Sequence, residues 1–285
     1  MPAEPRAGGW IAGYRLLRPI GQGTQSTVHL AERAADGQVV ALKIFNLAGA
    51  DAGARTAFLD SAETARRLVH PAIVAVLAVG VEGERGWLAM EPVAGVPLER
   101  YTRPARLLPE PVVLRVAEAV ASALAHAHRQ GVVHRDIKPA NILAHWPGAT
   151  IKLADFGLAR SADAGRTGTG VVLGSPSYMA PEQLAGSVPT PASDFYALGV
   201  TLFQLLAGRL PHEAHALGEL LRQVANEPAP DLRTLRPEVD AGLAALVARL
   251  LARHPGGRPP DGDALLQALR ALRSAPPDSG GAKSR

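Results

Sequence analysis

The chain has 285 residues, with 30 basic and 26 acidic side chains, a net charge of +4 and no cysteine. Its arginines are scattered, which does not predict nucleic-acid binding, and the lack of cysteine excludes disulfides and thiolate metal sites. No apolar run is long enough to span a bilayer, and residues 1–9 lack the apolar core of a signal peptide. We therefore expect a cytoplasmic protein without a membrane span.

The first elements in chain order are a tail and a strand-rich segment. Residues 1–9, like residues 274–285 at the other end, are rich in proline, glycine and serine, so we expect disordered tails. Residues 14–90 are typical of short strands with one helix. Asp36-Gly37 lies between two alternating runs, a pattern that predicts a β-hairpin.

From Glu110 onward the pattern is helical. Pro111 can open a helix that closes at Gly131. Its apolar residues fall on one face: Val113, Val116, Ala117, Val120 and Leu124. A second buried helix is predicted from Ser193, as N-cap, to Ala207, with Gly208 as its stop. Short helices are predicted near 216–225, 240–252 and 262–273.

Residues 132–143 contain three polar side chains between apolar flanks. Asp136, Lys138 and Asn141 offer a carboxylate, an ammonium and a carboxamide within six positions. About twenty residues later, Asp155 stands on a turn after another apolar run. A base, a phosphate-directed lysine and two oxygen ligands for a hard cation are the groups that phosphoryl transfer requires.

These motifs resemble a known family. His134-Arg135-Asp136 with Lys138 and Asn141, followed by Asp155-Phe156-Gly157, is similar to the catalytic core of the bacterial, eukaryotic-like (Hanks-type) Ser/Thr protein kinases. The resemblance runs from about Tyr14 to about Leu272. It implies an α+β, two-lobed protein-kinase fold in a domain of residues 10–273. A small lobe, about 14–92, would hold an antiparallel sheet and one helix, and a larger lobe, about 93–273, would be helical, with an ATP cleft between them.

The resemblance also implies roles for the catalytic residues. Asp136 would accept the proton of the substrate hydroxyl, and Lys138 would neutralise the transferring γ-phosphate. Asn141 and Asp155 would hold Mg²⁺ ions, with Mn²⁺ as an alternative. His134 is expected to pack under the loop and bond to its backbone. The activity implied is ATP-dependent phosphorylation of Ser/Thr in protein substrates.

A second set of residues would bind the nucleotide. The glycine-rich segment from Ile20 to Val28 would bring backbone amides close to phosphate oxygens, with Ser26 in place of the family's third glycine. Lys43, inside an apolar strand, would reach the α- and β-phosphates and counts among the catalytic residues. The nucleotide-binding residues implied by the resemblance are Ile20, Gly21, Gly23, Ser26, Val28, Ala41, Lys43, Met90, Glu91, Val93 and Leu143.

Several of these residues would contact the adenine ring. Val28 and Ala41 would cover one side of the ring and Leu143 the other. Met90 would stand at the gatekeeper position. The carbonyl of Glu91 and the amide of Val93 would hydrogen-bond the ring edge.

One position departs from the family. The glutamate that pairs with the strand lysine would fall on Ser61. Asp60 and Glu63 are close, but they lie roughly 100° and 200° away around a helix. Three alternatives remain open: a shifted or kinked helix lets one of them reach Lys43, Lys43 pairs with another group such as Asp155, or the ion pair is missing. The third would favour a pseudokinase that acts as a nucleotide- or partner-binding scaffold.

The scaffold of the large lobe also has expected pairings. Glu182, in Ala180-Pro181-Glu182, would pair with Arg258, and Asp194 would hydrogen-bond the backbone of the catalytic loop. His126 and His128 stand two apart on a helix with no completing metal ligands, so we expect ordinary helix residues.

Residues 155–182 form a long loop of the kind that is usually functional or disordered. Its end resembles the substrate-docking segment of Ser/Thr kinases, which argues against a small-molecule phosphotransferase. Arg135 can order such a loop by pairing with a phosphorylated residue. The candidates are Thr167 and Thr169, ahead of Ser161 and Ser175. Autophosphorylation would then occur in trans through self-association.

Overall fold

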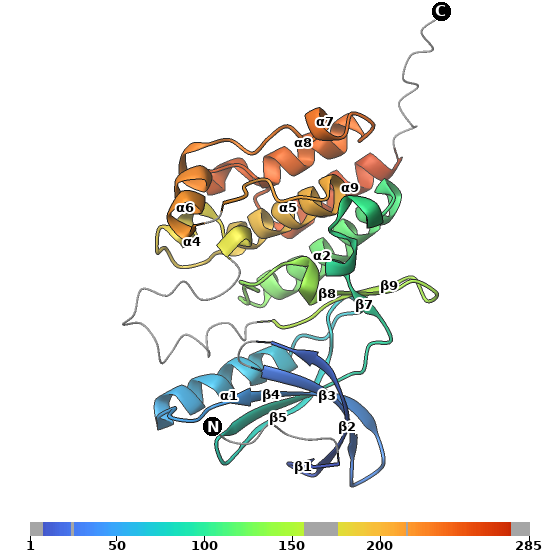
Figure 1. Ribbon diagram of the computed structural model, residues 1–285, viewed down its shortest axis with the longest axis vertical. Coiled ribbons are helices and arrows are strands. Elements are labelled where there is room, and N and C mark those ends of the chain that lie inside the picture. Colours follow the sequence, from blue (N-terminus) through green and yellow to red (C-terminus); the bar gives the residue numbers. More distant parts are fainter. Residues whose placement is uncertain (1–7, 24–25, 157–175, 215, 275–285) are drawn as a thin grey trace, which may run out of the picture. The chain divides into compact units, whose positions relative to one another are not determined.

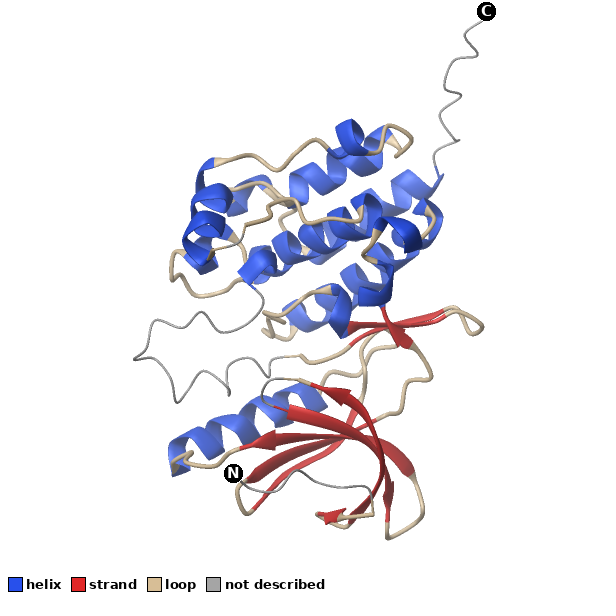
Figure 2. Cartoon of the chain, viewed as in Figure 1, coloured by secondary structure: helices blue, strands red, loops and turns tan. Residues whose placement is uncertain are grey.

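The computed structural model of the chain describes residues 8–23, 26–156, 176–214 and 216–274. The chain divides into two compact units (Figures 1 and 2). One unit comprises Met1–Gly95 with His145–Gly174, and the other comprises Val96–Ala144 with Ser175–Arg285. Each unit is described by itself.

The first unit is built on a six-stranded antiparallel sheet with the strand order β1-β2-β3-β4-β6-β5. Its strands are β1 (Trp10–Ile11), β2 (Tyr14–Gln22), β3 (Ser26–Arg33), β4 (Val39–Asn46), β5 (Val76–Glu82) and β6 (Arg85–Met90). One helix, α1 (Ala52–Arg66), accompanies the sheet (Figure 1). A short strand from the later part of the chain, β9 (Thr150–Leu153), also belongs to this unit.

The hairpin predicted at Asp36-Gly37 is confirmed between β3 and β4. Gly37 has a φ of 73°, a left-handed conformation that favours glycine. The Arg33 guanidinium donates to the Asp36 carboxylate at 2.9 Å, and the Gly37 amide donates to the Arg33 carbonyl at 2.8 Å. These bonds close the turn that joins the two strands.

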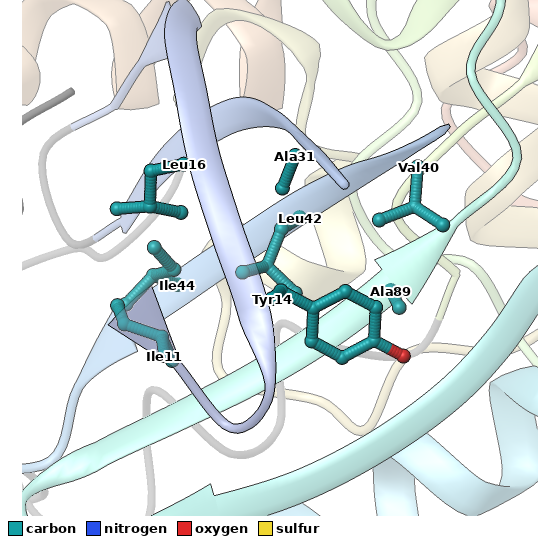
Figure 3. Close-up of a cluster of buried hydrophobic side chains, with 8 residues drawn as sticks. All are labelled: Ile11, Tyr14, Leu16, Ala31, Val40, Leu42, Ile44 and Ala89. Carbon is teal, nitrogen blue, oxygen red and sulfur yellow. The ribbon is translucent and has the colours of Figure 1, made fainter. Parts of the chain in front are cut away.

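Eight buried side chains from five strands form a hydrophobic cluster on this sheet (Figure 3). They are Ile11, Tyr14, Leu16, Ala31, Val40, Leu42, Ile44 and Ala89. The alternation along β4 explains the membership, because Val40, Leu42 and Ile44 point to one face of the sheet and Lys43 to the other. The same alternation thus fixes the direction of the lysine.

The helix α1 packs through Phe58. Its ring lies 5.2 Å from that of Phe45 on β4, and it fills the space above Gly86, where an added Cβ would stand 2.6 Å from the ring. Asp51 caps the helix by accepting from the Ala54 amide at 2.7 Å. The helix therefore has a fixed face toward the strand that carries Lys43.

The second unit is helical. Its helices are α2 (Glu110–Arg129), α4 (Pro181–Leu184), α5 (Pro191–Ala207), α6 (Leu217–Asn226), α7 (Leu232–Leu235), α8 (Ala241–Leu250) and α9 (Gly262–Ser274). Short 3₁₀ turns occur at Leu98–Tyr101, Pro104–Arg106, Pro139–Asn141, Pro176–Tyr178 and Pro255–Gly257, and the strands are β7 (Val96–Pro97) and β8 (Ile142–His145). The five predicted core positions of α2 are all buried, which confirms its apolar face.

The start of α5 differs from the prediction. The helix begins at Pro191, with Thr190 as its N-cap, and not at Ser193. Proline has a φ suited to the first turn and needs no hydrogen-bond acceptor there, so it opens the helix earlier. The Ser193 hydroxyl instead accepts from the Thr190 amide at 3.1 Å and donates to Glu182 at 2.9 Å. The predicted stop is confirmed, since Gly208 has a φ of 74°.

The ends of the described chain are ordered by backbone pairing and helix packing. Gly8 donates to the Leu16 carbonyl at 2.8 Å, and the Leu16 amide donates to Gly9 at 2.9 Å. Ser274 is the last residue of α9. Among the described residues, no helix has both the length and the apolar character needed to cross a membrane.

Candidate active site

The loop that follows α2 brings three predicted residues together. Lys138 Nζ lies 2.8 Å from Asp136 Oδ2 and 3.0 Å from Oδ1. Asn141 Nδ2 donates to the Asp136 carbonyl at 2.7 Å and to Oδ2 at 2.9 Å. The Asp136 carboxylate is thus held by two side chains, while 29% of its side chain stays exposed. A fixed carboxylate that solvent can reach is suited to accept a proton from an incoming hydroxyl.

The same loop is anchored from below by Asp194 on α5. Asp194 Oδ2 accepts from the His134 amide and Oδ1 from the Arg135 amide, each at 2.8 Å. Arg135 has a φ of 73°, an uncommon conformation for a residue with a side chain. The fully buried His134 accepts from the Asp136 amide at 3.2 Å, which confirms its expected place under the loop.

His128 also belongs to this anchor, although the sequence predicted an ordinary helix residue. Its Nε2 lies 2.8 Å from Asp194 Oδ2, and its ring meets Phe195 edge-on at 5.4 Å. The available signal was its position four residues after Leu124, on the buried face of α2.

The predicted pair of Glu182 and Arg258 is confirmed as a buried fork. The guanidinium donates to both carboxylate oxygens, at 2.6 Å and 2.9 Å, and the Arg258 side chain is 0% exposed. Burial alone would raise the pKa of Glu182, but hydrogen bonds from Arg258 and from Ser193 hold that pKa below its ordinary value. Arg258 also lies 5.0 Å from the Tyr196 ring.

Tyr178 ends the 3₁₀ turn Pro176–Tyr178, which precedes α4. Its hydroxyl donates to Gln204 on α5 at 2.6 Å. Burial raises the pKa of Tyr178 to about 12, with smaller contributions from the Glu99 and Asp136 carboxylates. The Tyr178 hydroxyl therefore stays protonated at neutral pH, near enough to Asp136 to be affected by its charge.

A further ion pair between two predicted site residues lies in the first unit. Lys43 Nζ lies 2.7 Å from Asp155 Oδ1, and the two side chains are 12% and 23% exposed. Asp155 has a φ of 69°, the second residue of the site in the left-handed region. Such strain tends to occur where the surrounding structure serves a function.

The alternatives for Lys43 are thereby resolved in this structure. Glu63 pairs with Arg66 on the same helix, at 2.5 Å. Asp60 is exposed, and Ser61 is half-buried on the side of α1 that carries Phe58. Lys43 is paired with Asp155, which is the second of the three alternatives that the sequence left open.

The other residues predicted to bind the nucleotide lie on β2, directly after it, on β3, β4, β6 and β8, and on the segment after β6. The Gly23 amide, just after β2, donates to the Ser26 carbonyl at the start of β3 at 2.8 Å. Val28 stands opposite Lys43 on the neighbouring strand, and Met90 stands opposite Ala41. Ile20 and Gly21 are exposed, Val93 is half-buried, and Leu143 lies half-buried on β8 in the second unit.

Glu91, directly after β6, has a network that the sequence did not predict. Its carboxylate Oε1 accepts from the Ala75 amide at 2.8 Å and from Lys152 Nζ at 2.6 Å. Its own amide donates to the Ala75 carbonyl at 3.0 Å. Lys152 was not among the predicted site residues, because its partner stands 61 positions away in the chain.

Two predicted metal ligands have the right atoms for a hard cation. Asn141 uses its amide nitrogen toward Asp136, which leaves its Oδ1 as the acceptor. Asp155 gives Oδ1 to Lys43 and retains Oδ2. Carboxylate and carboxamide oxygens are the ligands that Mg²⁺ prefers, so the donor set fits this ion.

The predicted phosphorylation sites Thr167, Thr169, Ser161 and Ser175 lie outside the described residues, as does Gly157. They remain predictions.

Comparisons with known proteins agree with this geometry. The family profile described as "Protein kinase domain" matches residues 14–268. The chain is 36% identical over 245 residues to serine/threonine-protein kinase PrkC of Bacillus subtilis, and 40% identical over 263 residues to serine/threonine-protein kinase PknJ of Mycobacterium tuberculosis. These alignments cover 85% and 90% of this chain but only 38% and 44% of the relatives, so the chain spans less than half of their length.

A solved structure shares the fold. The crystal structure of Rad53 1–466 in complex with AMP-PNP matches with a TM-score of 0.76 at 23% identity, covering 90% of this chain and 64% of that one. At this identity the match shows the fold alone. The chain belongs to the protein kinase domain family and has its fold of a sheet lobe followed by a helical lobe.

Proposed function

We propose that the chain is the catalytic domain of an ATP- and Mg²⁺-dependent protein serine/threonine kinase. The observation that carries this proposal is the Asp136 carboxylate, which Lys138 and Asn141 hold on a loop anchored to Asp194. The names of the relatives support the Ser/Thr specificity, and the AMP-PNP in the Rad53 structure supports ATP as the donor.

The reaction moves the γ-phosphoryl group from ATP to a side-chain hydroxyl of a protein. The bond between the γ-phosphorus and its bridging oxygen to the β-phosphate breaks, and a new bond forms to the serine or threonine oxygen. Asp136 accepts the hydroxyl proton, and ADP leaves with the bridging oxygen. Most of the catalysis is positioning and charge stabilisation, so the second role of Asp136 is to orient the hydroxyl.

The other second-unit groups stabilise charge. Lys138, at hydrogen-bond distance from Asp136, brings a positive charge to the γ-phosphoryl group. Leu143 covers one side of the adenine. The acceptor segment of the protein substrate would pass near Tyr178, which feels the Asp136 charge.

The first-unit groups bind the nucleotide. The glycine-rich turn, with Ile20, Gly21, Gly23 and Ser26, brings amides to the phosphates. Lys43 neutralises the α- and β-phosphates. Val28, Ala41 and Met90 line the adenine side, and the backbones of Glu91 and Val93 read its edge.

Asn141 and Asp155 would hold the metal. When bound, Mg²⁺ supplies charge neutralisation on the phosphates. Because Asp155 is paired with Lys43, holding the metal would compete with that ion pair, and Lys43 would be the group that neutralises the nucleotide phosphates. Mn²⁺ has the same preference for oxygen ligands and could replace it.

The substrates are proteins with accessible serine or threonine residues, and the first substrate would be a second copy of the chain. Phosphorylation at Thr167 or Thr169 would require transient self-association. Because ATP is the donor, this chemistry belongs in the cytoplasm.

Incubation with labelled ATP and Mg²⁺ tests the proposal, with Asp136→Asn as the inactive variant and Asp263→Asn as the matched control. Asp263 is a carboxylate of the same unit whose side chain is 69% exposed. We expect label on the wild type and the control and none on Asp136→Asn. Equal label on all three would overturn the proposal, as would binding of ATP without transfer in the wild type.

A further inference from the structure

Lysine is rare in this chain. Of its 30 basic residues, 26 are arginine and four are lysine. The part of the chain that the structure describes contains three of the four, Lys43, Lys138 and Lys152, and each forms an ion pair with a carboxylate. Two of these lysines belong to the proposed phosphoryl-transfer site. The third, Lys152, has no assigned role.

Lys152 lies on β9 and reaches the residue that follows β6. Its Nζ is 2.6 Å from Glu91 Oε1 and 3.4 Å from the Ile73 carbonyl, and its side chain is 16% exposed. The same Glu91 oxygen accepts from the Ala75 amide at 2.8 Å. Lysine is a compact point charge on a flexible stem, so it can converge on one oxygen with a backbone amide, where a planar guanidinium would need more space.

Backbone hydrogen bonds connect the segments on both sides of the Lys152–Glu91 pair. The Leu153 amide donates to Ala72 at 2.8 Å, and the Val74 amide donates to Leu153 at 2.9 Å. The segment 72–75 is thereby paired with β9 on one side and with Glu91 on the other. Asp155, the partner of Lys43, follows two residues after Leu153. One continuous set of hydrogen bonds thus joins the Glu91 peptide to the strand that leads into Asp155.

We propose that Lys152 is a positioning residue for the nucleotide. By holding the Glu91 carboxylate, Lys152 fixes the backbone of Glu91, which hydrogen-bonds the adenine edge, relative to β9, the strand that leads to Asp155. This inference rests on the proposed function, because it takes Glu91 as a nucleotide-binding position. It assigns Lys152 no contact with the nucleotide itself.

The cause of the effect is electrostatic. The Glu91 side chain is 29% exposed, so its carboxylate is partly removed from water. Loss of the Lys152 ammonium leaves the Glu91 carboxylate with the Ala75 amide as its single hydrogen-bond donor. The carboxylate then turns toward solvent, and this movement displaces the Glu91 backbone. Removing both charges leaves no such stress, since glutamine can still accept from the Ala75 amide.

The experiment compares the wild type, Lys152→Met, the double variant Lys152→Met with Glu91→Gln, and Arg33→Met as the matched control. Arg33 forms an ion pair with Asp36 in the same unit, at the far end of β3 from the glycine-rich turn. Binding of mant-ATP with Mg²⁺ gives Kd, and phosphorylation rates give kcat and the KM for ATP.

We expect Lys152→Met to raise Kd and KM for the nucleotide about 5- to 20-fold, as when part of a charged hydrogen bond is lost, with kcat changed less than about twofold. The double variant should recover most of the affinity, to a Kd about two- to threefold above that of the wild type. Arg33→Met should bind as the wild type does.

Unchanged Kd in Lys152→Met would overturn the inference, and so would a rise in kcat at constant KM, because the pair would then restrain turnover. Equal weakening in the double variant would overturn the route through Glu91. If Lys152→Met fails to fold, the double variant alone tests the inference. A Kd about two- to threefold above that of the wild type would support the inference, and a Kd equal to that of the wild type would contradict it. A wild type that binds mant-ATP but transfers no phosphate would defeat the proposed function, while the Kd comparison would still decide the role of Lys152.

Discussion

The Asp194 carboxylate accepts the amide of Arg135 at 2.8 Å, and Arg135 has a left-handed backbone with a φ of 73°. The two observations are connected, because a strained conformation persists only where its surroundings fix it. Asp194 is 1% exposed and comes from the N-terminal turn of α5. The backbone next to the proposed base is thus set by a side chain 59 positions away.

Replacing Asp194 should therefore affect turnover more than nucleotide binding. In Asp194→Asn, one of the two acceptor oxygens becomes an amide group that cannot accept, so the bond to either the Arg135 or the His134 amide is lost. We expect kcat to fall about 100-fold, the usual size of a small misplacement of a catalytic group, with the KM for ATP nearly unchanged. Initial-rate kinetics would measure both. A KM effect larger than the kcat effect would contradict this account.

Ser61 offers a second test, since α1 presents no carboxylate to Lys43. Ser61→Glu would place one on the face of the helix that carries Phe58, and it would compete with Asp155 for the lysine. Freed from Lys43, Asp155 could take its proposed place at the metal. We expect kcat to rise about 3- to 10-fold, equivalent to up to ~1.4 kcal/mol of transition-state stabilisation.

The matched control for this helix is Thr56→Glu, which adds the same charge at an exposed position of α1. Kinase assays at several Mg²⁺ concentrations would compare the two variants. A fall in kcat for Ser61→Glu, with Thr56→Glu unchanged, would mean that the pair of Lys43 with Asp155 is the productive arrangement.

The fork of Arg258 and Glu182 should make stability depend on pH. The pKa of Glu182 is held below its ordinary value in the folded protein. Its contribution is therefore complete above the unfolded pKa of 4.5 and is lost as the pH falls through the folded pKa. Urea unfolding at several pH values should show that Glu182→Gln is less stable than wild type at about pH 7, and that the difference shrinks below about pH 4.

Arg258→Met would leave Glu182 without its charged partner in a partly buried place, and we expect a loss of about 3 to 5 kcal/mol at neutral pH. A constant difference between wild type and Glu182→Gln down to about pH 3 would show that the charge of Glu182 is not what stabilises the fork.

Packing gives a fourth prediction. A Cβ at Gly262, the first residue of α9, would stand 2.6 Å from Cα of Ala125 on α2, and backbone cannot move aside easily. Gly262→Ala should cost about 1 to 3 kcal/mol of unfolding free energy. Gly218, in α6, has nothing within 4 Å of an added Cβ. Gly218→Ala should instead be neutral or stabilising by up to about 1 kcal/mol, as measured by urea unfolding. Equal effects of both would refute the packing argument.

The elements that the sequence predicts well are those with local signals. Asp36-Gly37 specifies its hairpin, and the apolar face of α2 follows from spacing alone. The start of α5 was predicted wrongly, because Ser193 has the chemistry of a cap, while Pro191 just before it has the better geometry for a first turn. The strand β1 is too short, at two residues, to give a periodic signal.

The charged pairs divide along the same line. The resemblance to the kinase family implied the pair of Glu182 with Arg258 and the bonds of Asp194 to the loop. The pair of Lys152 with Glu91 could not be predicted, because a lysine between Ile151 and Leu153 is what any half-exposed strand shows. Only the structure identifies Asp155 as the partner of Lys43, since the sequence offered three carboxylates and no geometry to decide between them.

Ile11 has a practical meaning for where the domain starts. The family profile begins at Tyr14, yet Ile11 is 1% exposed within the cluster that contains Tyr14, Leu16 and Ile44. A protein that begins at Tyr14 would lack the buried Ile11 side chain and the backbone hydrogen bonds of Gly8 and Gly9 to Leu16. The smallest stable piece of the chain should therefore begin no later than Gly8, and a shorter one should expose apolar surface and aggregate on expression.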